Sequence, residues 1–346
     1  MWELSADNVV DYLNRTGRLR PGSTATAQPL AWGVSNLVLR VEPDDQPPLV
    51  IKQSRPQLRT KVDWFSRCER IYREAEVLRA LLPVLPPGAV PQVLFEDREN
   101  FVLALEAIRP DHAVWKQRLL EDRLDFDVAD RLGGYLGLIH RETAGRPDVL
   151  PDAADWSLFD ELRIDPFYRW IARVHPSIDS AINDLIEEMN RHRVCLVHAD
   201  FSPKNVLVHV DGVTLVDFET GHYGDPAFDL GFFLSHLLLK SLRSNDQRVD
   251  WRRLVTAFWS RYRKIVDATG QTTVSSTATT ARAVRHLAGC LLARIDGKST
   301  VDYLRDPWQP VAVRQTTLRW LADPPPTLDH ALDDFFTRTP APGLPE

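Results

Sequence analysis

The chain has few cysteines, and the three it has follow no recognisable pattern. Among 346 residues only Cys68, Cys195 and Cys290 are cysteines. They are odd in number and too far apart to indicate a disulfide framework or a zinc site. We therefore expect three free thiols in a reducing compartment. There is also no internal repeat, which argues against a solenoid.

Long hydrophobic runs and an excess of positive charge are absent as well. The most apolar stretch, residues 231–239, is too short to span a bilayer and contains His236. Residues 1–7 lack the charged segment and apolar core of a signal peptide. The formal net charge is −6, whereas nucleic-acid-binding proteins usually carry a basic surface. We therefore expect a cytoplasmic protein with no membrane or nucleic-acid partner.

The first 108 residues predict a small antiparallel sheet with one long helix. Residues 21–29 are expected to form a loop, and the apolar spacing around residues 71–82 is typical of a helix. Short β-rich runs separated by turn residues predict two strand pairs. These runs are residues 37–41, 49–52, 92–96 and 100–105.

Residues 109–346 have a mostly helical pattern with one polar hairpin in the middle. The hairpin is predicted around Asp211-Gly212, a dipeptide that favours a tight two-residue turn. The clearest amphipathic helical segments are residues 128–139, 182–189, 232–242, 251–266 and 279–295. The expected fold class is therefore α+β, with residues 1–108 as a β-rich first domain and residues 109–346 as a larger helical one.

Asp200, Asn205 and Asp217 carry the strongest chemical signal. Transfer of a phosphoryl group from ATP requires an oriented acceptor hydroxyl, a group that accepts its proton, and a metal ion that neutralises the phosphates. An aspartate on a loop can do the first two, and an asparagine five residues later can bind Mg²⁺ through its carbonyl oxygen. A second aspartate after a tight hairpin can return to the same ion, which prefers few protein oxygens plus phosphate oxygens.

The spacing from His198 through Asp217-Phe218 matches the catalytic and metal motifs of kinases. The chain resembles the aminoglycoside phosphotransferase/choline kinase superfamily of protein-kinase-like enzymes, and its 5-methylthioribose-kinase-like members most of all. The resemblance extends over residues 32–304 and is strongest over residues 197–231. It implies a protein-kinase-like bilobal fold, with a small antiparallel N-terminal lobe and a larger helical C-terminal lobe. It also implies ATP and Mg²⁺ as cofactors and a small-molecule alcohol as acceptor.

The resemblance implies roles for the motif residues. Asp200 is expected to be the catalytic base, and Asn205 and Asp217 are expected to hold Mg²⁺. Glu219 is a candidate for a further metal or water contact. Asp229 is expected to brace the catalytic loop.

The resemblance also implies a nucleotide site. Lys52 is expected to reach the α- and β-phosphates, and Glu74 is expected to pair with it, with Glu76 as the alternative. A loop over the phosphates and a hinge that grips adenine by its backbone complete the site. These segments contribute Gly33, Ser35 and Asn36 for the loop and Glu106 and Ile108 for the hinge.

Two other functions remain open at this point, a catalytically inactive nucleotide-binding module and a protein kinase. Protein kinases have a Gly-x-Gly-x-x-Gly loop, whereas here only Gly33 stands in that region. Residues 220–224 alone separate Asp217-Phe218-Glu219 from Asp225-Pro226, which leaves little platform for a peptide. In addition, Ala199 stands where the small-molecule branch usually has glycine.

The acceptor is open as well: a sugar such as methylthioribose, an amino alcohol such as choline, or an aminoglycoside. A cationic acceptor requires an acidic or aromatic cage, for which the candidates are Asp160, Glu161, Asp165 and Trp170. Basic residues near a predicted helix end are interpreted first as structural and alternatively as part of the acceptor pocket. These are Arg282, Arg285, Arg294 and Lys298. The sequence leaves the oligomeric state undefined.

Overall fold

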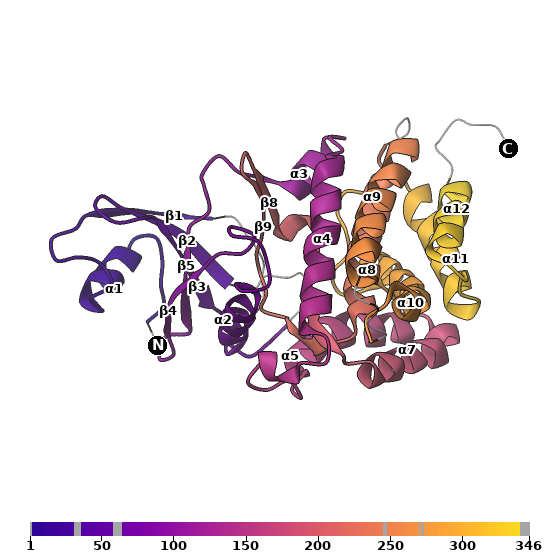
Figure 1. The fold of residues 1–346 in the computed structure, drawn as a ribbon, viewed down its shortest axis with the longest axis horizontal. Helices are drawn as coiled ribbons and strands as arrows, with labels where there is room; N and C mark the ends of the chain where they lie inside the picture. Colours follow the sequence, from indigo (N-terminus) through magenta and orange to yellow (C-terminus); the bar gives the residue numbers. More distant parts are fainter. Residues whose placement is uncertain are drawn as a thin grey trace.

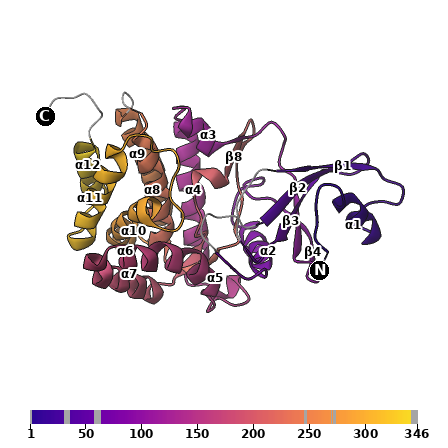
Figure 2. The same ribbon diagram turned by 180° about the vertical axis from the view of Figure 1, so that it is seen from behind.

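The structure is a computed structural model that describes residues 2–30, 36–57, 64–244, 248–268, 270 and 273–339. An antiparallel sheet near the N-terminus is followed by a larger, mostly helical region (Figure 1). We call the first part the sheet region, which contains β1–β5, α1 and α2, and the second part the helical region. The two regions lie end to end, and α11 and α12 lie farthest from the sheet in both views (Figure 2).

Five strands form the sheet, in the order β1-β2-β3-β5-β4, and all neighbouring pairs are antiparallel. The predicted strand pairs are confirmed. In the β2–β3–β5 register, Lys52 lies between Val38 and Leu103. The strands are β1 Ala25–Pro29, β2 Asn36–Pro43, β3 Leu49–Ser54, β4 Val93–Asp97 and β5 Val102–Glu106.

The prediction of a loop over residues 21–29 is wrong for its second half. Ala25–Pro29 forms β1, an edge strand paired with β2 through five residue pairs. Its side chains are exposed or half-buried, and those that alternate towards the core, Ala25 and Ala27, are small, so the hydrophobic signal for a strand is weak. Backbone hydrogen bonds to β2 define this strand, and Pro29 at its end is typical of an edge position.

The two faces of the sheet pack against different helices. Leu39, Ile51 and Ala104 pack on one face with the helix α1 Val9–Arg15. Because side chains alternate along a strand, their neighbours point to the opposite face, which is covered by α2 Arg70–Leu81. Lys52 follows Ile51 in β3, so its side chain points to this second face, where α2 lies.

The helical region consists of helices around a short three-stranded sheet and a two-stranded ribbon. The strands are β6 Ala113–Val114, β7 Cys195–Val197, β8 Val206–His209, β9 Gly212–Leu215 and β10 His222–Gly224. The main helices are α3 Trp115–Leu120, α4 Phe126–Thr143, α7 Asp179–Arg191, α8 Pro226–Ser241, α9 Arg248–Val266, α10 Ser276–Asp296, α11 Trp308–Ala322 and α12 Leu328–Arg338. The short elements are η1 Pro147–Val149, α5 Ser157–Phe159, α6 Trp170–Val174, η3 Pro176–Ile178 and η4 Pro203–Asn205.

Close helix packing forms the core of the helical region. α8 is buried along its whole length and packs against α10. α4 and α9 approach closely at Gly133 and Gly137, where an added Cβ would meet Phe258 O at 2.2 Å and Ile265 Cβ at 2.8 Å. The predicted helices are thus confirmed. Within the described ranges, no helix combines the length and apolar character needed to cross a membrane.

One of the elements that the sequence did not indicate contributes to the site. Asp160–Arg169 forms a π-helix, η2, with Pro166 inside it. Proline cannot donate a backbone hydrogen bond, and such wide turns are rare and often occur near functional sites. This element carries Arg163 into the region of the catalytic motif.

Candidate active site

Asp229 anchors the loop that carries the catalytic motif. Its carboxylate accepts hydrogen bonds from the backbone N–H groups of His198 and Ala199, each at 2.8 Å. His140 Nε2 lies 3.3 Å from the same carboxylate, and the Asp229 side chain is fully buried. Burial opposes ionisation of Asp229, yet the hydrogen bonds from His140 and the loop hold its pKa below its ordinary value. The contact expected between Asp229 and the catalytic loop is therefore present.

We expect Asp229→Ala to destabilise the protein by on the order of 3 kcal/mol, because two buried N–H groups lose their acceptor. The catalytic loop should also lose its alignment. Urea unfolding of both proteins measures the first effect. Asp184→Ala is the matched control, since Asp184 is exposed on α7 and its loss should change the free energy of unfolding by less than about 0.5 kcal/mol. An equal effect of the two substitutions would contradict the anchoring role.

The loop holds Ala199 in an unfavourable conformation. Its φ angle is 60°, in the left-handed region that favours glycine. Both its peptide groups are fixed: its N–H donates to Asp229, and its carbonyl accepts from Arg163 Nε at 2.7 Å. These two anchors hold a backbone geometry that the usual glycine would adopt without strain.

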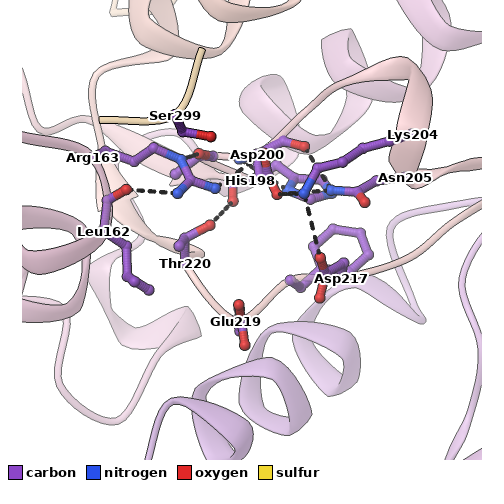
Figure 3. Close-up of polar contacts among 12 residues, drawn as sticks. Leu162, Arg163, His198, Asp200, Lys204, Asn205, Asp217, Glu219, Thr220 and Ser299 are labelled. Atoms are coloured by element: carbon purple, nitrogen blue, oxygen red, sulfur yellow. Dashed lines mark hydrogen bonds and ion pairs between the residues drawn. The ribbon is translucent and has the colours of Figure 1, made fainter. Parts of the chain in front are cut away.

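Asp200 lies at the centre of a polar cluster (Figure 3). Its Oδ1 is 3.0 Å from Arg163 Nη2, and its Oδ2 is 2.8 Å from Lys204 Nζ. Asn205 Nδ2 donates to both Oδ2 and the backbone carbonyl of Asp200, each at 3.0 Å. Burial raises the pKa of Asp200, but Arg163 and Lys204 outweigh it and the pKa is lowered. Asp200 is thus an oriented carboxylate at neutral pH.

Lys52 connects the sheet region to the metal motif. Its Nζ is 2.5 Å from Glu74 Oε2 and 3.0 Å from Asp217 Oδ1. Burial alone would lower the pKa of Lys52, but the charges of Asp217 and Glu74 raise it, so the ammonium group is retained. Of the two predicted partners, Glu74 makes the contact, whereas Glu76 pairs with Arg73 at 3.3 Å.

Asn205 and Asp217 are the oxygen-bearing side chains available for a metal ion. Burial raises the pKa of Asp217, but the positive charges of Lys52 and Lys204 outweigh burial and hold this pKa below its ordinary value. The carboxylate therefore stays ionised. Its φ angle is 72°, and Lys204 Nζ lies 3.9 Å from its Oδ2. No group of three or more His, Cys, Asp or Glu suited to a metal occurs among the residues that the structure describes. A metal ion here would therefore need phosphate oxygens to complete its coordination, as Mg²⁺ does in nucleotide sites.

Glu219 is engaged by the sheet region. Its Oε2 accepts from Asn36 Nδ2 at 2.8 Å and from Arg70 Nε at 3.2 Å. Arg70 is fully buried and also donates to the carbonyl of Arg55 at 2.7 Å. The Asn36 side chain therefore links the first residue of β2 to the metal motif, and a phosphate contact at this position would use its backbone.

The predicted hinge follows β5. The amide of Glu106 donates to the Gln92 carbonyl at 2.9 Å, and the Ile108 carbonyl accepts from Arg40 Nη1 at 2.8 Å. The N–H of Ile108 has no hydrogen-bond partner within the described ranges. It is thus the amide of this segment that an adenine ring could use. The two other predicted phosphate-loop residues, Gly33 and Ser35, lie outside the described residues.

Comparison with known protein families identifies the family of this chain. The profile described as "Phosphotransferase enzyme family" matches residues 26–267, which is well over half of the chain. The chain belongs to this phosphotransferase family. The methylthioribose kinases of Pectobacterium atrosepticum and Escherichia coli are 24% and 25% identical to it, over 263 and 274 residues. These matches cover 68% of this chain but only 65% and 64% of the relatives, so the chain spans less than two thirds of their length.

Solved structures confirm the predicted kinase-like α+β fold. An amicoumacin kinase in complex with AMP-PNP, Ca²⁺ and Ami matches with a TM-score of 0.58 at 13% identity, covering 90% of this chain and 93% of that chain. A macrolide 2′-phosphotransferase from Brachybacterium faecium matches with a TM-score of 0.51 at 16% identity, covering 98% and 100%. At this level of identity, the likeness shows the fold alone.

Two residues of the polar cluster around Asp200 were missed or left unplaced by sequence reasoning. Arg163 had no motif to mark it, because it lies 37 positions before Asp200 on the unpredicted π-helix η2. Lys204 is one residue before Asn205 but had no predicted direction. Both side chains contact Asp200, so they orient and stabilise its carboxylate.

The acidic residues considered for a cationic acceptor are already paired with basic side chains of the protein itself. Asp160 binds Arg169 at 2.7 Å and Glu161 binds Arg67 at 2.8 Å. Asp165 contacts Arg173 at 3.0 Å and Lys298 at 3.3 Å, and Lys298 also lies over the Trp170 ring at 5.2 Å. These residues do not form an open cage for a cationic substrate.

A buried histidine on β10 is expected to make the protein sensitive to acid. His222 stacks on Phe159 with ring centroids 4.1 Å apart, and burial lowers its pKa from 6.5 to about 4. Because the folded pKa of this base is depressed, the unfolded chain takes up the proton first as the pH falls. We expect stability to be lost between pH 6.5 and about 4, by up to about 3 kcal/mol from this group.

Replacing His222 with glutamine should reduce the slope of the free energy of unfolding against pH in this acid range, by an amount that corresponds to at most one proton. Urea unfolding between pH 4 and pH 8 measures it, with His330→Gln as the control because His330 is exposed on α12. An unchanged slope in His222→Gln would show that His222 is not the titrating group.

Proposed function

We propose that the protein transfers the γ-phosphate of ATP, with Mg²⁺, to a hydroxyl group of a small molecule. The observation that carries this proposal is that Lys52 of the sheet region lies beside three side chains of the catalytic motif, namely Asp200, Asn205 and Asp217. Lys52 of β3 contacts Asp217, and Lys204 lies between Asp200 and Asp217 and contacts both carboxylates. A proton acceptor, two metal-binding oxygens and a phosphate-binding cation therefore lie in one continuous polar network.

Asp200 is the proposed catalytic base. Its carboxylate is held by Arg163 and Lys204, so it is fixed in one orientation and ionised before the acceptor arrives. The acceptor hydroxyl would donate a hydrogen bond to this carboxylate and pass its proton there as the bond to phosphorus forms. Phosphoryl transfer of this kind depends mainly on positioning and charge neutralisation.

Asn205 and Asp217 are the proposed Mg²⁺ ligands, and Lys52 is the proposed phosphate contact. Bound Mg²⁺ would neutralise charge on the β- and γ-phosphates. Asn205 donates through Nδ2 to Asp200, which turns its Oδ1 away from that carboxylate. Glu74 fixes Lys52 from α2, and the Ile108 N–H is proposed to bind adenine.

The acceptor is proposed to be a polyol or sugar-like alcohol rather than a cation. The methylthioribose kinase relatives support a sugar-like acceptor. The pairing of Asp160, Glu161 and Asp165 with arginines and lysine argues against choline-like or aminoglycoside acceptors. The short segment of residues 220–224 likewise offers no platform for a peptide substrate.

A coupled ADP-release assay tests this proposal. Wild-type protein is supplied with Mg²⁺-ATP and a panel of alcohols that contains neutral sugars, amino alcohols, aminoglycosides and hydroxy acids. We expect ADP release that depends on one class of acceptor and is lost when EDTA removes the metal. Tight binding of Mg²⁺-ATP without turnover on any acceptor would instead support the inactive nucleotide-binding module. Efficient phosphorylation of a protein would contradict the small-molecule assignment.

A further inference from the structure

Three basic residues near the catalytic loop have no carboxylate partner. Lys116 of α3, Lys240 of α8 and Arg294 of α10 form what we call the cation cluster. None of them has an ion pair within the described ranges. The other basic candidates around α10 do: Arg282 binds Asp225 at 2.8 Å, and Lys298 binds Asp165 at 3.3 Å. The cation cluster is therefore a set of charges that the chain itself does not neutralise.

Lys240 is the most unusual member. It is 2% exposed, and its Nζ donates only to the carbonyl of His236 in its own helix, at 3.2 Å. Lys240 and Lys116 both lie over the Tyr303 ring, at 5.0 and 5.9 Å. Burial lowers the pKa of Lys240 well below its ordinary value, and the charges of Lys116 and Arg294 lower it further. An ammonium group in such a place needs an anion to hold its charge.

Other polar atoms beside the cation cluster also lack partners. His236 Nε2, Tyr303 Oη and Arg294 Nε are buried without a hydrogen bond. Both His236 and Tyr303 are 7% exposed. Buried polar groups are nearly always paired, so the orphan atoms of His236 and Tyr303, together with the orphan Nε of Arg294 within the cluster, point to a missing ligand. Asp302 faces Lys116 and Lys240, but it is exposed and forms no ion pair with them.

The cation cluster adjoins Asp200. Arg163, which binds Asp200, lies over the Phe167 ring at 5.8 Å, and Arg294 lies over the same ring at 5.9 Å. Arg163 also lies over the Phe232 ring, which packs edge-on against His236 with centroids 4.9 Å apart. The helix α3, which carries Lys116, packs against η4 beside Asn205. Arg294 of the cation cluster and Arg163, the partner of the proposed base, thus contact the same aromatic ring.

We propose that the cation cluster binds a carboxylate or phosphate group of the acceptor, so that the substrate is an anionic alcohol. The inference rests on the proposed function, because it assigns a charge to the acceptor of that reaction. Lys116, Lys240 and Arg294 supply the charge, and His236 and Tyr303 supply further hydrogen-bonding groups. The hydroxyl of such a substrate would extend from this anchor towards Asp200.

Stability separates this role from a structural one. Lys240→Met keeps the length of the side chain but removes its buried charge, so it should leave Tm unchanged or raise it when no anion is present. A Lys240 that serves only to stack on Tyr303 would instead lose a favourable contact, and Tm would fall. The control is Lys264→Met, because Lys264 is exposed on α9.

Binding of inorganic phosphate to the protein saturated with Mg²⁺-AMP-PNP tests the site directly. Calorimetric titration should show one phosphate bound to wild type and to Lys264→Met, and affinity lower by about 10- to 100-fold in Lys240→Met. Equal affinity in Lys240→Met, or no phosphate binding to wild type, would overturn the proposal. If phosphate binds through Lys240 but Mg²⁺-AMP-PNP does not bind at all, the anion site stands and the proposed function fails.

Matched acceptors then test the substrate class. Ribose is compared with ribose 5-phosphate, and glycerol with glycerate. We expect kcat/KM to be about 10- to 100-fold higher for the anionic member of at least one pair, and Lys240→Met to raise its KM far more than it lowers kcat. Turnover of neutral members only, with Lys240→Met indistinguishable from Lys264→Met, would confirm the kinase activity and refute the anionic acceptor.

Discussion

Replacing Asp200 with alanine is expected to lower kcat by about 10²–10⁴-fold, the usual contribution of a positioned general base. The KM for ATP should change little, because the contacts of Asp200 are with Arg163, Lys204 and Asn205 and not with Lys52. Steady-state ADP release at saturating acceptor measures kcat. Nucleotide affinity is measured separately by titration with Mg²⁺-AMP-PNP.

Two controls make the Asp200 result interpretable. Asp200→Asn keeps the shape of the side chain but cannot accept the proton, so it should be nearly as inactive as Asp200→Ala. Asp184→Ala should retain full activity, since Asp184 is exposed on α7. A variant without Asp200 that binds nucleotide and keeps more than about a tenth of the wild-type kcat would contradict the assignment of the base.

Asp217→Asn is expected to have the second large effect, a fall in kcat/KM of about 10²–10³-fold. The substitution removes one negative charge between Lys52, at 3.0 Å, and Lys204, at 3.9 Å. An amide is a weaker ligand for a hard cation than a carboxylate, so bound Mg²⁺ should be lost more readily. The measurement is the Mg²⁺ concentration that gives half-maximal activity, which should rise at least about tenfold.

The metal dependence distinguishes a ligand from a merely structural carboxylate. If Asp217 served only to hold Lys52, the variant would bind ATP more weakly but would need no more Mg²⁺ than wild type. Asp184→Asn is the matched control. A normal Mg²⁺ requirement in Asp217→Asn would therefore remove Asp217 from the proposed metal site.

The catalytic motif could be predicted from the sequence because its members are close together along the chain. Asp200, Asn205 and Asp217 lie within 18 residues and are separated by a hairpin whose Asp211-Gly212 turn is recognisable on its own. The Lys52–Glu74 contact was also predictable, since it needs only the alternation of β3 and one helix packed on that face of the sheet. The roles of these residues, and a domain boundary near residue 108, remain predictions.

Other features could not be predicted because they depend on tertiary packing. The strand β1 has a weak apolar alternation, through Ala25 and Ala27, and is defined by backbone pairing with β2. Arg163, which contacts Asp200, lies on η2, whose π-helical backbone no local pattern indicated. Arg70 is a basic residue in a basic stretch, yet it is fully buried against Glu219. The cation cluster draws one residue each from α3, α8 and α10, so no local pattern could indicate it.

The most direct test of the central claim follows the phosphoryl group itself. ATP labelled with ³²P in the γ-phosphate is incubated with Mg²⁺, the alcohol panel and either wild-type protein or Asp200→Asn. The account predicts that label moves to a small-molecule acceptor in the wild-type reaction, and that the transfer falls by about 10²–10⁴-fold in the variant. Label that is released only as inorganic phosphate, or transferred equally by both proteins, would contradict it.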